Sequence, residues 1–427
     1  MESATSWDGT IDFIRHIREE VESETSSVNS IELDTGRSTK QLEDNLLSDS
    51  DLEEYLHPVS STQVESYTEI YTKACSDLKV IPCSPFLRQI CDEEIDISHY
   101  NIGPKGTKAA AKVLKRNTIT TLLNISDNGV DVGGAKALAG MLSENCFITV
   151  LDLSMNFIKE AGVEAICVVL ESNKYIIELS LESTRVNDSA SVFIANALKE
   201  NTTLRLLNLG SNEIGEEGGV ALASGIAENY GVFDLDLSGN HIRNKGAVAI
   251  AGALGMNSML QSIDLSRNGF ADNGAKALGE ALKVNDTLRE LYLAENRLSI
   301  NGAWGLGIGL EQNAYLKVLK LCGNPMHSRG AVLLIQSLIL NVDSVLSELY
   351  INDVSVSSDF ESVLNELLQQ RPGLHVQFGK VIRGKEHRRR GKQQKVPCLF
   401  FILLAILISM YENWRNGVDC VLLSERL

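Results

Sequence analysis

The sequence predicts an α/β solenoid, an array of stacked strand–turn–helix units. Asparagine recurs every 28 residues along two separate ladders, apolar pairs precede the first ladder, and small and apolar residues at helical spacing follow it. The first ladder consists of Asn128, Asn156, Asn212, Asn240, Asn268, Asn296 and Asn324. The second consists of Asn117, Asn145, Asn173, Asn201, Asn229, Asn257, Asn285, Asn313 and Asn341. Eight regular units therefore fill residues 119–342 without insertion.

Each unit contains the signals of its strand, its turn and its helix. In LDLSGNHI (235–242), Leu235 and Leu237 alternate with polar residues, which predicts a short strand with one buried face. The first-ladder amide both donates and accepts, so it is suited to satisfying backbone groups in the turn. A Gly-Ala pair and leucines at helical spacing, such as Leu278 and Leu282, then predict a helix. Each unit has an apolar flank that only the next unit can cover.

Three irregularities interrupt the pattern. Thr184 and Ala190 replace the first-ladder Asn and the Gly of one unit, so we expect the array to be softest there. Tyr100 stands at the ladder position of the first unit, and the last unit runs two residues long before Val354. Both terminal units are predicted to cap the array.

The repeat LxxLxLxxNxIxxxGAxxLxxxL resembles the leucine-rich repeat, in the long class found in ribonuclease inhibitor and Ran GTPase-activating protein. The resemblance covers about residues 91–375. Segments 71–90, 243–254 and 348–356 are most similar to the leucine-rich repeat-containing protein 74 group, a likeness that implies the fold and no particular activity. The resemblance implies a horseshoe with a parallel concave sheet and outer helices.

Side chains between the buried leucines then face the concave side, because strand side chains alternate. Asp236 and Asp264 are expected to lie within mutual repulsion range. The predicted partner-binding residues are Asp152, Glu178, Glu182, Asp234, Asp236, Asp264, Glu290, Tyr292 and Glu295. Three interpretations stay open for this acidic face: a basic protein partner, a solvated face without a ligand, and a divalent cation site.

Charge and composition exclude several classes of function. The net charge of −17 argues against general nucleic-acid binding. Eight cysteines lack metal-ligand spacing, the seven histidines form no catalytic group, and no phosphate-binding loop is present. We therefore expect no enzyme, no cofactor and no metal site. One exception stays open, a regulator of a small GTPase acting through Arg243, Arg267 and Arg297 in the rim loops.

The two ends differ from the repeats. Residues 1–60 have a net charge of −11 and predict an acidic, mostly disordered tail, followed by a capping segment at 61–94 and the solenoid at 95–375. Residues 380–395 have a net charge of +7 and predict a basic linker. An uncharged apolar segment follows at 396–411, and a short tail at 412–427 ends the sequence.

The apolar segment allows three interpretations. It is a candidate tail anchor that would keep the solenoid cytosolic, with Cys398 as a candidate lipidation site. It could instead be a helix bound inside the chain or by a partner, or sequence outside the main protein product. The N-terminus lacks a signal peptide, so we expect a cytoplasmic location.

Taken together, these features favour a non-enzymatic scaffold that binds a basic protein surface through its concave face. The alternatives are the GTPase regulator and a membrane-tethered adaptor anchored by residues 396–411.

Overall fold

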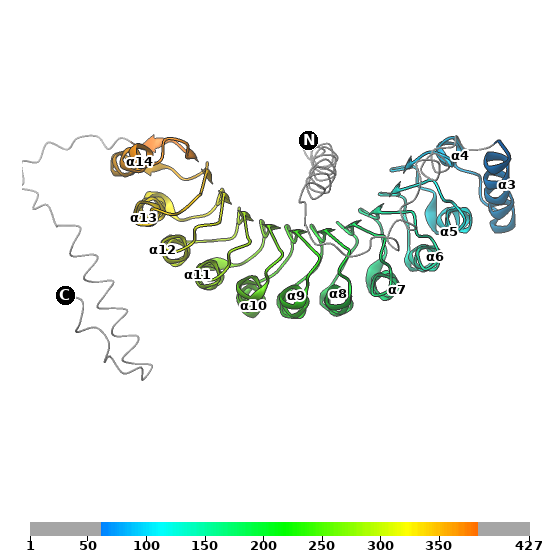
Figure 1. Ribbon diagram of the computed structural model, residues 1–427, viewed down its shortest axis with the longest axis horizontal. Helices are drawn as coiled ribbons and strands as arrows, with labels where there is room; N and C mark the ends of the chain where they lie inside the picture. Colours follow the sequence, from blue (N-terminus) through cyan, green and yellow to red (C-terminus); the bar gives the residue numbers. More distant parts are fainter. Residues whose placement is uncertain (1–60, 383–427) are drawn as a thin grey trace, which may run out of the picture. The chain divides into compact units, whose positions relative to one another are not determined.

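The computed structural model describes residues 61–382, within which eleven strands form one parallel sheet. The strands follow one another in chain order, and all of them belong to the unit Val64–Leu427. Figure 1 shows the strands on the inside of a curved array and the helices on the outside. The predicted fold class is confirmed.

The strands are short and regularly placed. They are β1 (Glu94–Asp96), β2 (Leu122–Asn124), β3 (Val150–Asp152), β4 (Glu178–Ser180), β5 (Leu206–Asn208), β6 (Asp234–Asp236), β7 (Ser262–Asp264), β8 (Glu290–Tyr292), β9 (Val318–Lys320), β10 (Glu348–Ile351) and β12 (His375–Phe378). A separate two-stranded sheet pairs β11 (Val356–Ser357) with β13 (Val381–Ile382). The sheet continues through β12 to Phe378, whereas the solenoid was predicted to end at residue 375.

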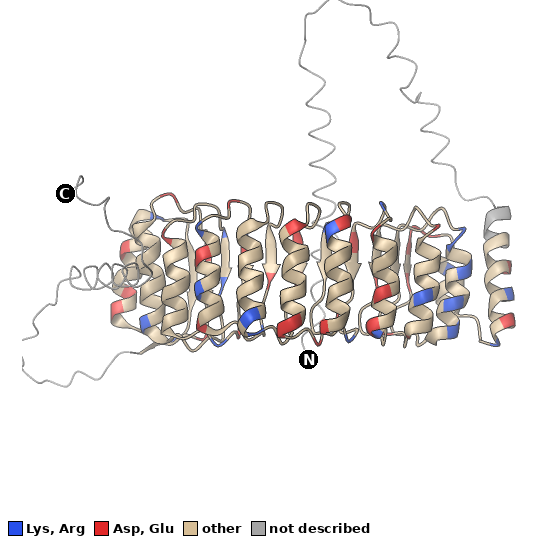
Figure 2. Cartoon of the chain, turned by 90° about the horizontal axis from the view of Figure 1, so that it is seen from below, with Lys and Arg blue, Asp and Glu red and all other residues tan. Residues whose placement is uncertain are grey.

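One helix follows each strand of the regular array. The helices are α5 (Gly103–Leu114), α6 (Val132–Leu142), α7 (Lys159–Leu170), α8 (Asp188–Glu200), α9 (Glu216–Glu228), α10 (Asn244–Met256), α11 (Ala271–Leu282), α12 (Ile300–Leu310), α13 (His327–Leu340) and α14 (Ser358–Gln370). Two further helices, α3 (Ser61–Leu78) and α4 (Ser84–Gln89), precede the first strand. Figure 2 shows the outer helix face, where acidic and basic side chains are interspersed.

The core lies between the sheet and the helices, as the alternation predicts. Leu235 and Leu237 are 2% and 0% exposed, and the middle residue of every strand from β1 to β9 is buried. The register advances by one whole unit at each step, because Leu235 pairs with Leu207 on one side and with Ile263 on the other. Equivalent residues of successive repeats therefore stand side by side across the sheet.

Small residues let two of the outer helices approach closely. The Gly-rich segment GLGIGL (305–310) lies in α12, where Gly309 faces the backbone of Gly279 in α11. A Cβ atom on Gly309 would overlap the Gly279 carbonyl group. Glycine is therefore required here by close packing between helices.

The first-ladder asparagines tie each turn to its neighbours. Asn156 donates from Nδ2 to the carbonyl oxygen of Ile125 in the preceding repeat at 3.0 Å, and its Oδ1 accepts the backbone N–H groups of Asn128 and Val130 at 3.0 and 2.9 Å. The same donation to the residue 31 positions earlier recurs along the ladder, at Asn128, Asn212, Asn240, Asn268, Asn296 and Asn324. Each amide thus joins consecutive repeats as well as satisfying its own turn.

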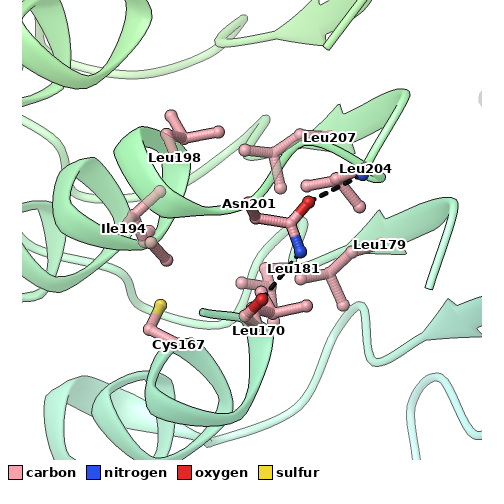
Figure 3. Close-up of a pocket in the computed structure, with 10 residues that line it drawn as sticks. Cys167, Leu170, Leu179, Leu181, Ile194, Leu198, Asn201, Leu204 and Leu207 are labelled. Atoms are coloured by element: carbon pink, nitrogen blue, oxygen red, sulfur yellow. Dashed lines mark hydrogen bonds between the residues drawn. The ribbon is translucent and has the colours of Figure 1, made fainter. Parts of the chain in front are cut away.

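The second-ladder asparagines satisfy backbone groups at the opposite ends of the strands, where each strand begins. Sequence reasoning did not assign them this role. Asn201 donates to the carbonyl oxygen of Leu170 at 2.7 Å, where α7 ends, and accepts from the backbone N–H of Leu204 at 2.8 Å (Figure 3). The lining of this part of the core is otherwise apolar. Without the amide, a helix C-terminus and the start of a strand would both leave unsatisfied polar groups.

The Thr184 turn keeps part of this network. The Thr184 hydroxyl donates to the Leu181 carbonyl oxygen at 2.6 Å, and its backbone N–H donates to Asn212 at 3.0 Å. The shorter side chain makes no bond to the preceding repeat, unlike the ladder amides on either side. The missing link therefore lies between the third and fourth strands of the array.

Candidate binding surface on the concave face

The concave face is formed by the first and third residues of each strand. Because equivalent residues of successive repeats pair with one another, these residues form two rows that run across the sheet. The first-position row includes Glu178, Asp234 and Glu290, separated by Leu206 and Ser262. In the third-position row, Asp236 pairs directly with Asp264. We call the carboxylates of this region the acidic hollow; they are Asp152, Glu178, Glu182, Asp234, Asp236, Asp264 and Glu290.

The third-position carboxylates also have a structural role. Asp236 Oδ1 accepts the backbone N–H of Ser238 at 2.7 Å, and Asp264 accepts that of Ser266 at the same distance. Asp152 makes the equivalent bond to Ser154 at 2.8 Å. Each bond satisfies the backbone where the chain leaves the strand. The acidic residue type is not required for it, because Asn208 accepts from Gly210 in the same way.

Burial distinguishes members of the hollow. Glu178 is 3% exposed and Asp152 is 5% exposed, whereas Glu94, the first-position residue of β1, is exposed. Glu178 stands between Val150 and Leu206 in the register. Its Oε2 atom is buried and makes no hydrogen bond with the described residues. The hollow therefore holds a carboxylate without the partner that buried charge normally has.

This arrangement shifts the ionisation of the hollow toward the neutral form. Burial, with a further contribution from Asp234, raises the pKa of Glu178 to about 7. Burial and then the neighbouring Asp236 raise the pKa of Asp234 to about 6. Burial is also the main cause of the raised pKa values of Asp152, Glu182 and Asp264.

Within residues 61–382 no ion pair involves a carboxylate of the hollow, and the nearby Arg267 offsets only part of the rise in the pKa of Asp264. The four ion pairs between described residues lie elsewhere, at His99–Asp127, Lys115–Glu144, Lys199–Glu228 and Lys283–Glu280. In the same residues, no group of three or more His, Cys, Asp and Glu side chains is arranged to hold a metal ion. The hollow is thus a surface of like charge.

An aromatic cluster borders the hollow on its C-terminal side. The Lys320 ammonium lies 4.3 Å from the ring centroid of Tyr292 and 5.5 Å from that of Tyr350. The hydroxyl of Tyr292 donates to Glu290, and that of Tyr350 donates to Glu348 at 2.6 Å. Sequence reasoning placed Tyr292 on this face but missed Tyr350 and Glu348. The repeated tripeptide ELY, at 290–292 and 348–350, was the available signal.

The remaining predicted residues fall outside this surface. Glu295 is exposed in the turn beyond β8, where its φ of 55° departs from the strand. Arg243, Arg267 and Arg297 are exposed on the rim loops. Cys398, the apolar segment 396–411 and the acidic tail 1–60 lie outside the described residues. Across the part of the chain that is described, every helix is too short or too polar to span a bilayer.

These features define a repeat solenoid whose concave sheet presents an acidic, partly aromatic surface. Five segments, 117–139, 144–167, 200–223, 234–251 and 257–279, match the family described as Leucine Rich repeat. The chain therefore contains leucine-rich repeats, and its fold is a leucine-rich-repeat solenoid. Repeats of this family act as scaffolds for protein–protein interactions.

Two solved structures are similar to the chain. The first, described as actin-binding site 2 of leiomodin-1, is 24% identical, with 36% of this chain and 80% of that chain covered and a TM-score of 0.28. The second, an internalin (InlF) from Listeria monocytogenes, is 14% identical, with 75% of this chain and 93% of that chain covered and a TM-score of 0.42.

Proposed function

We propose that the protein is a non-enzymatic scaffold whose acidic hollow binds a lysine- and arginine-rich segment of a protein partner. The observation that carries this proposal is the set of neighbouring carboxylates on β4 to β8 that form no ion pair with the described residues. Like charges in adjacent strands destabilise the fold. A basic segment would relieve that repulsion on binding, so the hollow favours basic partners over acidic ones.

The size of the effect follows from individual ion pairs. Each exposed pair contributes about 0.2–1 kcal/mol, so three carboxylates contribute about 0.6–3 kcal/mol. This corresponds to about a threefold to 150-fold change in affinity. Binding should weaken as salt is added, because the screening length falls to about 8 Å at physiological ionic strength.

The test is a triple substitution that removes charge but keeps the turns. Asp236→Asn and Asp264→Asn can retain their strand-end bonds, as Asn208 does, and Asp234→Asn removes a first-position charge that makes no such bond. The full chain and its variant would be titrated with a fluorescent peptide of alternating lysine and serine. We expect the triple variant to bind about threefold to 150-fold more weakly.

A matched control removes the same charge from the outer face. Glu160→Gln and Glu164→Gln on α7, with Glu217→Gln on α9, change exposed residues far from the concave rows. This control should bind the peptide nearly as tightly as the unaltered chain. Equal loss in both variants would mean that net charge, rather than the hollow, attracts the peptide, and the proposal would be withdrawn.

A further inference from the structure

The described array ends beside a segment of opposite charge. β13 ends at Ile382, and residues 383–395 contain seven Lys or Arg residues and one Glu. Three arginines, Arg388, Arg389 and Arg390, are consecutive. This segment is the most basic stretch of an otherwise acidic chain.

The hollow contains the groups that such a segment would satisfy. Asp234, Asp236 and Asp264 are only partly buried, so they remain accessible to a cationic side chain. Glu178 adds an unpartnered carboxylate oxygen that is inaccessible to solvent in the described state. No ion pair between described residues competes for these groups.

The chain between them is long enough. The segment starts after Ile382 in β13, which pairs with β11 in the repeat of β10, and β10 and β6 are four strand steps apart, about 19 Å at about 4.8 Å a step. An extended chain covers about 3.3 Å a residue, so residues 383–390 span about 26 Å. The triple arginine can therefore reach the central carboxylates.

We propose that the basic segment 383–395 occupies the acidic hollow of its own chain and competes there with basic partners. This proposal rests on the proposed function, because it assigns a second ligand to the same surface. Binding within one chain needs no bimolecular encounter. The scaffold is then self-occluded, and a partner must displace the segment before it binds.

Effective concentration sets the expected size of the competition. A short tether gives an effective concentration on the order of 1 mM. If the separate segment binds with a Kd of about 0.1 mM, the ratio of chains with an occupied hollow to chains with a free hollow is about 10. The apparent affinity for an external basic peptide is then about tenfold weaker than in a chain without the competing charge.

The experiment uses the full chain and the lysine–serine peptide. Arg388→Gln, Arg389→Gln and Arg390→Gln together should tighten peptide binding about tenfold. A matched control, Lys105→Gln, Lys112→Gln and Lys136→Gln on α5 and α6, removes the same charge from the outer face and should leave the affinity nearly unchanged. Adding the triple arginine substitution to the neutralised hollow variant should produce no tightening, because the shared site is gone.

The outcomes separate the two proposals. If the arginine variant and the unaltered chain bind the peptide equally, and the hollow variant still loses binding, the proposed function stands and self-occlusion is wrong. If none of the chains binds the peptide, the proposed function fails, and self-occlusion fails with it. If the gain in peptide affinity depends on chain concentration, the segment binds the hollow of a second copy, and occupation within one chain is wrong.

Discussion

Replacing Glu178 with leucine should stabilise the fold, and the gain should grow with pH. Leucine or valine already occupies the equivalent first position in four other strands, at Leu122, Val150, Leu206 and Val318. The substitution removes a buried carboxylate whose Oε2 has no hydrogen-bond partner among the described residues. It therefore replaces an unsatisfied polar group with a side chain that the register accepts.

The pH dependence follows from the raised pKa. The folded chain holds the Glu178 proton up to a pKa of about 7, whereas the unfolded chain releases it near the ordinary value of 4.5. Between these values the folded state binds more protons, so stability falls as pH rises and stays lower above pH 7. The total is about 3 kcal/mol, of which about 1 kcal/mol has accumulated by pH 5 and about 2 kcal/mol by pH 6.

The assay is urea unfolding of the full chain and of Glu178→Leu at pH 5 and pH 8. The variant should gain about 2 kcal/mol more at pH 8 than at pH 5. Glu94→Leu is the matched control, because Glu94 has the same register position on β1 but is exposed. A gain that is equal at both pH values, or a destabilised variant at pH 8, would refute the burial argument.

Three further predictions concern the links between repeats. Asn240→Ala removes bonds to Leu209, Leu237 and Ile214 and should destabilise the chain by about 2–4 kcal/mol in urea unfolding, whereas the exposed Asn301→Ala should change it little. Thr184→Asn should restore the missing link and raise the free energy of unfolding by about 1 kcal/mol; a loss would mean that the turn has adapted to threonine. Gly309→Ala should force α11 and α12 apart and lower the free energy of unfolding by about 1–3 kcal/mol. An unchanged melting temperature would disprove the close packing.

Much of the fold could be predicted because the repeat is invariant in length. Once Leu235 and Leu237 are assigned to the core, the 28-residue period fixes the face of every equivalent residue. Asp236 therefore had to lie on the concave face beside Asp264. The period could not reveal what the Asp236 side chain bonds to, because that depends on the turn after the strand.

The burial and the contacts of individual side chains could not be predicted from the sequence. Glu94 and Glu178 have the same register position and the same residue type, yet one is exposed and the other is buried. The position of Lys320 between the rings of Tyr292 and Tyr350 depends on three neighbouring strands at once. The array was expected to be softest at Thr184, and the Thr184 hydroxyl supplies one bond that a ladder amide would otherwise make.

The asparagine links also make the length of the array an adjustable property. Each link joins an asparagine to a residue of the preceding repeat, which lies 31, 28 or 26 positions earlier in the sequence. Duplication or loss of one 28-residue unit in a gene would preserve every type of link, and it would change the reach of the concave face by one strand spacing, about 4.8 Å. A change of any other length would leave one junction without its links. The length of the concave face can therefore change during evolution in steps of one whole repeat.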